Sequence, residues 1–142
     1  MIDYDKIDVL LVEDNDLFRK TLIGVINRSD SLRCRDAFVS GEDALRALEE
    51  QSLAPDIVLL DIGLPGINGV ECIPKVKSLS PASKIVMLTI HDDDDNVFKA
   101  ICAGASGYLS KDAPAEEIVL AIESVLQGGA PMNSHIAKKV LD

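Results

Sequence analysis

The feature that most constrains the fold is a set of three short, nearly continuous apolar runs, each followed by a longer amphipathic segment. The runs occupy residues 7–12, 56–60 and 84–88. Unbroken apolar runs of this length are typical of strands that are covered on both faces, as in a parallel sheet. Residues 33–38 and 107–109 are weaker strand candidates, and they fall where the same alternation requires a strand.

The segments between the runs carry apolar side chains at helical spacing. These stripes lie within residues 18–26, 44–48, 97–104 and 118–126, and a further helix is predicted after Asn68. Strand and helix therefore alternate five times, and parallel strands need right-handed helical crossovers. We predict an α/β fold of the flavodoxin-like, doubly wound (βα)5 type. Its five-stranded parallel sheet should have the order 2-1-3-4-5, with helices on both faces.

One helix start is marked with particular clarity. Asn68 is followed three residues later by Glu71, which resembles a capping box. Pro74 then falls beyond the first turn, where it removes a backbone hydrogen bond. We therefore predict either a local kink at Pro74 or a later start of this helix.

The charge and hydropathy of the chain exclude some classes of protein. Its 142 residues include 24 acidic and 14 basic side chains, so the net charge is −10. A domain that grips nucleic acid by its phosphates needs a basic face, so we expect no DNA binding by this chain alone. No apolar run approaches the ~18 residues of a membrane span, so we expect a cytoplasmic protein that does not enter a membrane.

Polar side chains gather where the predicted strands end. Glu13 and Asp14 follow the first run, Asp61 follows the third strand, Thr89 the fourth, and Lys111 the fifth. In a sheet of this order, the active crevice lies beyond the carboxyl ends of the first and third strands. Two carboxylates about 4 Å apart repel by roughly 4 kcal/mol at an effective dielectric of about 20. Either one carboxylate takes up a proton, which raises its pKa, or a cation neutralises the site. The oxygen ligands favour Mg²⁺, with Mn²⁺ as an alternative.

A carboxylate nucleophile, Mg²⁺, a lysine and a hydroxyl donor suit phosphoryl transfer, which depends on positioning and on charge neutralisation. Each acidic residue on its own would be explained more simply as a loop carboxylate or a helix cap. Four strand ends that carry complementary groups favour a shared site.

Four stretches together carry a resemblance to a known family. They are residues 9–15 (VLLVEDN), 60–69 (LDIGLPGING), 87–89 (MLT) and 104–111 (GASGYLSK). Over residues 7 to about 127, the chain resembles response-regulator receiver domains of bacterial two-component systems, specifically those of the NarL/FixJ (LuxR-type) family. We therefore expect residues 1–127 to form a receiver domain. We interpret residues 128–142 as a linker towards a helix-turn-helix effector domain that this chain lacks.

The resemblance implies a role for each residue of the crevice. Asp61 would be the phosphoacceptor, and Glu13, Asp14, Asp61 and the backbone carbonyl of Gly63 would hold the metal ion. Thr89 and Lys111 would bind the phosphoryl oxygens, and Tyr108 would be the aromatic switch. Ile90 stands where many relatives have a small residue, so it and His91 are candidates for tuning access and the lifetime of the phosphoryl group.

The implied function is a phosphoacceptor switch rather than an enzyme. A sensor histidine kinase would transfer a phosphoryl group to Asp61 in a Mg²⁺-dependent reaction. The face formed by the fourth helix, fifth strand and fifth helix would then change to control a transcriptional output. A phosphorylation-linked homodimer is a further expectation.

Two other classes remain as alternatives. Phosphatases of the haloacid-dehalogenase type also use an aspartate nucleophile and Mg²⁺, but they need a second acid two residues later, where this chain has Gly63. A flavodoxin would need a phosphate-binding loop rich in Ser, Thr and Gly after the first strand. Residues 13–16 are Glu-Asp-Asn-Asp instead.

Overall fold

Five strands alternate with five helices along the chain. The computed structural model describes residues 6–90 and 94–128. In chain order the elements are β1 (Ile7–Val12), α1 (Asp16–Arg28), β2 (Leu32–Phe38), α2 (Gly41–Glu50), β3 (Ile57–Asp61), α3 (Gly69–Leu79), β4 (Lys84–Thr89), α4 (Asp94–Ala103), β5 (Gly107–Ser110) and α5 (Ala115–Leu126).

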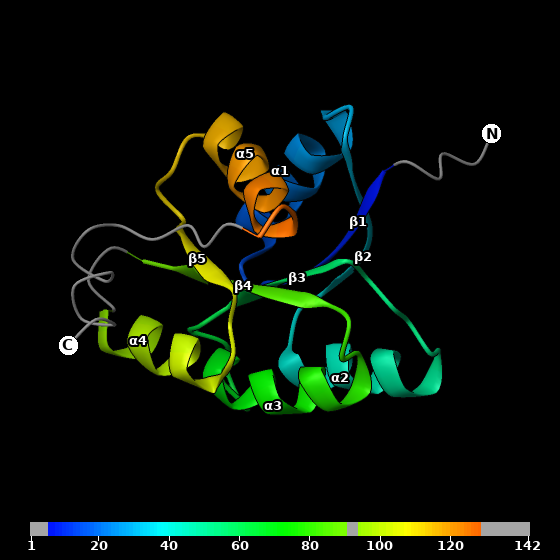
Figure 1. Cartoon of the computed structure of the whole chain (residues 1–142), viewed down its shortest axis with the longest axis vertical. Helices are drawn as coiled ribbons and strands as arrows, with labels where there is room; N and C mark the ends of the chain where they lie inside the picture. Colours follow the sequence, from blue (N-terminus) through cyan, green and yellow to red (C-terminus); the bar gives the residue numbers. More distant parts are fainter. Residues whose placement is uncertain (1–5, 91–93, 129–142) are drawn as a thin grey trace.

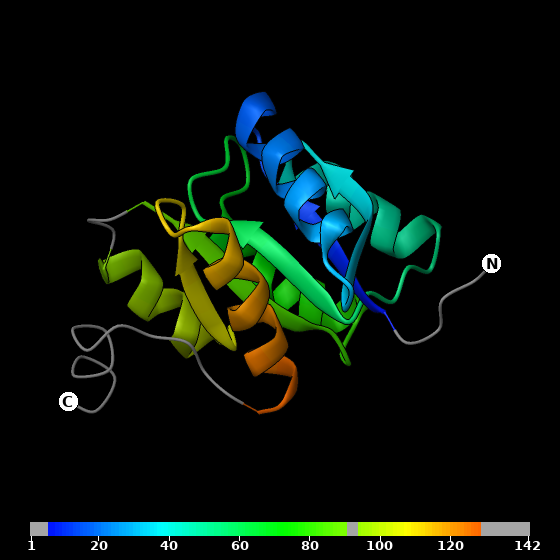
Figure 2. The same cartoon turned by 90° about the horizontal axis from the view of Figure 1, so that it is seen from above.

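The strands form one parallel sheet in the order β2-β1-β3-β4-β5, so the predicted fold and strand order are confirmed. Helices α1 and α5 cover one face of the sheet, and α2, α3 and α4 cover the other (Figure 1). Seen from above, α1 and α5 both lie over the sheet and run roughly along its strands (Figure 2). The order of the strands reverses at β1: the chain goes to β2 on one side of β1 and then returns to β3 on the other side. The carboxyl ends of β1 and β3 are therefore neighbours.

Each central strand is buried on both faces, which explains the unbroken apolar runs. In β1, Val9 and Leu11 pack with α1 and α5, whereas Leu10 and Val12 pack with α2 and α3. The same alternation continues along β3 and β4. Burying a side chain of this size contributes roughly 1.5–3 kcal/mol, so a polar substitution in these strands would be costly on either face.

Three strands extend one residue further than predicted. The predicted strands end at residues 60, 88 and 109, whereas β3, β4 and β5 end at Asp61, Thr89 and Ser110. Their neighbours in the sheet hold them there, since Asp61 is in register with Leu88 and Thr89 with Ser110. The two polar side chains of the crevice therefore project from sheet backbone, which is more rigid than a loop.

The predicted capping box is present, and of the two alternatives predicted for Pro74, a kink or a late helix start, the late start is excluded. The Asn68 side chain accepts from the Glu71 N–H at 2.9 Å, and the Glu71 carboxylate accepts from the Asn68 N–H at 3.4 Å. Helix α3 accordingly begins at Gly69 and continues through Pro74 to Leu79. Pro74 lacks only the donor that would reach the Val70 carbonyl, one turn earlier.

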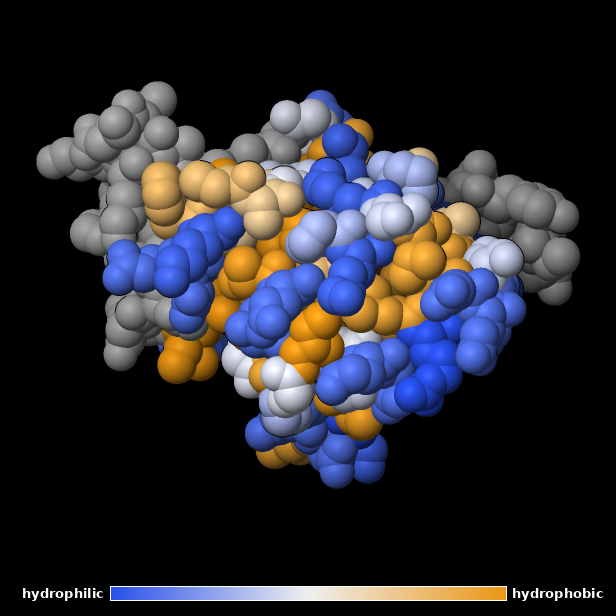
Figure 3. Space-filling view, turned by 90° about the horizontal axis from the view of Figure 1, so that it is seen from below, coloured by the Kyte–Doolittle hydropathy of each residue, from blue (hydrophilic) through white to orange (hydrophobic). Residues whose placement is uncertain are grey.

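The outer face of the α2–α3–α4 layer mixes hydrophilic and hydrophobic residues (Figure 3). Large hydrophobic side chains that are strongly exposed lie elsewhere in the described part of the chain, at Leu17, Val39, Ile90 and Leu120. Among the described residues, no helix is both long and apolar enough to cross a membrane.

Candidate functional site

The carboxyl ends of β1 and β3 bring three acidic side chains together. Carboxylate oxygens of Glu13, Asp14 and Asp61 all lie within 4.8 Å of one another. Glu13 is 0% exposed and Asp61 3% exposed, whereas Asp14 faces solvent. The predicted convergence of these strand ends is confirmed.

Glu13 is a fully buried carboxylate with an incomplete set of partners. Its Oε2 atom accepts from the Asn15 N–H at 3.0 Å, and its Oε1 atom lies 2.7 Å from Lys111 Nζ. Among the described residues, Lys111 is the one polar partner of Oε1. Burial raises the pKa of Glu13, against the lowering effects of the Asn15 N–H and Lys111.

Asp61 is held from two sides at the end of β3. Its Oδ2 atom accepts from Lys111 Nζ at 3.0 Å, and its Oδ1 atom accepts from the Gly63 N–H at 3.0 Å. Burial alone would lower the pKa of Lys111, but hydrogen bonds to Glu13 and Asp61 outweigh it, and the pKa is raised. Lys111 therefore stays charged between the two carboxylates.

Backbone contacts place Lys111 and Thr89 at the same edge of the sheet. The Lys111 N–H donates to the Thr89 carbonyl at 2.9 Å, and the Thr89 hydroxyl donates to the Ile90 carbonyl at 3.0 Å. Both residues line a hollow of about 320 Å³, together with Asp14, Asn15, Asp61, Ile62, Gly63 and Ile90. A phosphoryl oxygen that enters this hollow could reach the Thr89 hydroxyl.

The remaining predicted residues lie at different depths. Ile90 is 63% exposed and borders the hollow, so its side chain stands at the entrance. Tyr108 is buried in the core on the side of α4, together with Val97 and Ala100. Its movement on phosphorylation stays a prediction. His91 lies outside the described residues.

The donor set fits a divalent cation. Three carboxylates and one ammonium group leave a formal charge of −2 at the site. The buried Oε1 atom of Glu13, which lies 2.7 Å from the Lys111 ammonium, could serve as an oxygen ligand, and Mg²⁺ accepts such oxygens while keeping several waters. Glu13, Asp14 and Asp61 could hold the ion, and Gly63 lines the same hollow.

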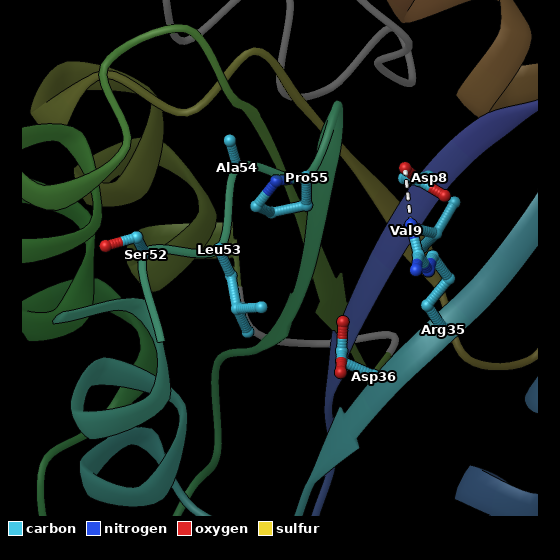
Figure 4. A pocket seen from close by; sticks show the side chains of 8 residues that line it. All are labelled: Asp8, Val9, Arg35, Asp36, Ser52, Leu53, Ala54 and Pro55. Atoms are coloured by element: carbon cyan, nitrogen blue, oxygen red, sulfur yellow. Dashed lines mark ion pairs between the residues drawn. The ribbon is translucent and has the colours of Figure 1, made fainter. Parts of the chain in front are cut away.

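A second hollow lies at the opposite, amino ends of the strands (Figure 4). It has a volume of about 390 Å³ and is lined by Asp8, Val9, Arg35, Asp36, Ser52, Leu53, Ala54 and Pro55. Asp8 pairs there with Arg33 at 2.8 Å and more loosely with Arg35 at 3.9 Å, so its charge is already compensated. The three clustered carboxylates and Lys111 lie at the carboxyl ends instead.

Sequence reasoning missed four residues that build the site. Asn15 caps α1 and also binds Glu13, and Arg19 donates to the Glu13 carbonyl at 3.0 Å. The Phe18 ring centroid is 5.4 Å from Lys111 Nζ. Gly69 packs directly against the backbone of Asp61. Asn15 could have been found from its cap position, but the other three contacts depend on the tertiary fold.

Replacing Lys111 by Met should tighten Mg²⁺ binding about tenfold, or roughly 1.4 kcal/mol, because a positive charge beside the cation is removed. The Lys111 side chain is only 20% exposed, so solvent screens this repulsion incompletely. Calorimetric titration with MgCl₂ measures the affinity. Lys84→Met is the matched control, since exposed Lys84 lies at the other end of β4. Unchanged or weaker binding by Lys111→Met would contradict this electrostatic account.

The fold and the site define the class of protein: a flavodoxin-like α/β domain with an acidic crevice that also contains a lysine. A family model described as the response regulator receiver domain matches residues 9–123, and this chain belongs to that family. The boundary between residues 127 and 128 stays a prediction, as does the linker, because residues 129–142 lie outside the described part of the chain.

Curated relatives include transcriptional regulators. The chain is 36% identical to the response regulator UvrY of Escherichia coli strain K12 over 134 residues, which is 94% of this chain and 61% of that protein. It is 30% identical to the transcriptional regulatory protein DegU of Brevibacillus brevis over 140 residues, which is 99% of this chain and 58% of that protein. The chain thus spans about three fifths of the length of these relatives.

Solved structures agree with the family assignment. A LuxR-family two-component response regulator from Aurantimonas sp. SI85-9A1 superposes with a TM-score of 0.84 at 30% identity, covering 96% of each chain. The signal receiver domain of the response regulator NarL from Mycobacterium tuberculosis gives a TM-score of 0.80 at 29% identity. That match covers 88% of this chain and 99% of the other. The predicted kinship with NarL/LuxR-type receivers is confirmed.

Proposed function

We propose that this chain is a phosphoacceptor switch in which Asp61 receives a phosphoryl group from a phosphohistidine of a sensor histidine kinase in the cytoplasm. One observation carries the proposal. A nearly buried strand-end carboxylate lies 3.0 Å from a lysine ammonium and within 4.8 Å of two further carboxylates, beside an open hollow. Receiver domains in general are signalling rather than enzymatic domains, and membership of that family supports a switch.

The transfer step uses groups that are already in place. An Asp61 carboxylate oxygen attacks the phosphorus, the P–N bond to histidine breaks, and its electron pair returns to the imidazole. Lys111 binds a phosphoryl oxygen, and Thr89 can donate its hydroxyl to another. A divalent cation at Glu13, Asp14, Asp61 and the Gly63 carbonyl would neutralise charge on the phosphoryl group.

The same contacts supply the switch. A phosphoryl group adds about −1.5 to −2 of charge and three acceptor oxygens. Thr89 now donates to its own neighbour, the Ile90 carbonyl, at 3.0 Å, and would exchange this bond for a phosphoryl oxygen. Because Thr89 ends β4 next to β5, its movement would bias Tyr108 and the face formed by α4, β5 and α5. That face would control a transcriptional output. One way to do so is the formation of a homodimer on phosphorylation.

A phosphatase of the haloacid-dehalogenase type is disfavoured by Gly63. At the position where that class needs an acid, this chain supplies only an N–H donor to Asp61 and a backbone carbonyl. Glycine has no side chain that could protonate a leaving group. The phosphoryl group should therefore stay on Asp61 rather than turn over rapidly.

The direct test is labelling with acetyl phosphate, followed by intact mass spectrometry, in MgCl₂ or in excess EDTA. We expect one phosphoryl adduct that forms only with Mg²⁺. Borohydride reduction of the adduct, followed by peptide mapping, should convert Asp61 to homoserine. An adduct that forms equally well in EDTA, or that maps to another residue, would contradict the proposed function.

A further inference from the structure

Lys111 has a third neighbour besides the two carboxylates. Its ammonium nitrogen lies 5.4 Å from the centroid of the Phe18 ring, within the range of a cation–π interaction. The Lys111 side chain is largely removed from water, which strengthens such a contact. This aromatic neighbour comes from α1, far from Lys111 in the sequence.

The position of the ring is coupled to the acidic loop through Asn15. The Asn15 side chain accepts from the Phe18 N–H at 2.8 Å and so holds the first turn of α1. The Asn15 N–H donates to Glu13 Oε2 at 3.0 Å. One residue therefore sets both the buried carboxylate and the ring that flank Lys111, while the ring itself packs against the core on the α1–α5 side.

We propose that Phe18 is a positioning residue for phosphoryl transfer, which holds the Lys111 ammonium beside Asp61 by a cation–π contact. This inference rests on the proposed function and adds a residue to its machinery. Glu13 and Asp61 are also the predicted ligands of the divalent cation, so the cation and Lys111 compete for the same oxygens. A phenyl ring has no oxygen ligand for Mg²⁺, so the cation does not compete with Lys111 for the ring. The ring therefore holds the Lys111 ammonium in place when the Glu13 and Asp61 carboxylates bind the cation.

The alternative role for Phe18 is core packing alone, and paired substitutions separate the two. Phe18→Leu keeps an apolar side chain but removes the π face, whereas Phe18→Tyr keeps the face. Phe38→Leu is the matched control. Phe38 is also a partly buried aromatic residue packed against a core cluster, but on the opposite face of the sheet.

Two measurements test the proposal. In wild type, NMR should show the Lys111 ε-methylene protons shifted upfield by the ring current, a shift kept in Phe18→Tyr and absent in Phe18→Leu. Labelling by acetyl phosphate with Mg²⁺ should slow about threefold in Phe18→Leu, as expected for loss of one cation–π contact. Labelling of Phe18→Tyr and Phe38→Leu should stay within about twofold of wild type.

Three results would overturn the proposal: no ring-current shift in wild type, equal slowing in Phe18→Leu and Phe38→Leu, or no rescue by Phe18→Tyr. A wild-type chain that takes up no phosphoryl group at all would instead refute the proposed function. The NMR shift would then decide by itself whether Phe18 holds Lys111.

Discussion

Asp61→Asn should abolish the Mg²⁺-dependent phosphoryl adduct. The amide has almost the same shape as the carboxylate but is not a nucleophile, so the P–O bond to the side chain cannot form. The substitution also removes one of three clustered negative charges, so Mg²⁺ should bind more weakly as well. Intact mass spectrometry after incubation with acetyl phosphate measures the adduct, and we expect only background labelling.

The matched control for this experiment is an aspartate just before the same strand. Asp56 immediately precedes β3, at the opposite end of the strand from Asp61, is exposed, and binds the Asp8 N–H at 2.8 Å. Asp56→Asn makes the same chemical change far from the crevice and should be labelled like wild type. If Asp61→Asn were labelled as fully as Asp56→Asn, Asp61 could not be the phosphoacceptor.

Gly69→Ala should damage both the fold and the site. A Cβ atom at Gly69 would meet the Asp61 carbonyl oxygen and the Ile62 Cα, the latter at 2.8 Å. Both are backbone atoms of the β3 end, so they cannot rotate away as a side chain would. We expect the free energy of unfolding to fall by about 2–3 kcal/mol through overpacking. We also expect phosphorylation to slow by about tenfold or more, because Asp61 is displaced.

Urea denaturation and the rate of labelling by acetyl phosphate measure these two effects. Gly63→Ala is the control, since a Cβ there would lie in ordinary contact, 3.8 Å from Asp61 Oδ1. That variant should change the free energy of unfolding by no more than about 0.5 kcal/mol. Wild-type stability together with wild-type labelling in Gly69→Ala would show that the close approach is relieved without moving Asp61.

The order of the strands could be predicted from the chain because each apolar run must be covered on two faces. Parallel strands joined by right-handed crossovers leave few arrangements for five strand–helix units. The sheet order then places the ends of β1 and β3 side by side, so Glu13, Asp14 and Asp61 could be assigned to one crevice. The start of α3 could also be predicted, from Asn68 and Glu71, and Pro74 did not delay it.

The amino-acid sequence by itself determined which groups are present and at which end of the sheet they gather, since periodicity and strand ends are local properties of the chain. Only the tertiary structure decided that Glu13 is buried while Asp14 is exposed, that Lys111 lies between Glu13 and Asp61, and that Phe18 faces Lys111. These features arise from side chains that are distant in sequence and are packed to within a few ångströms. No local pattern encodes such distances, because they depend on how the helices settle on the finished sheet.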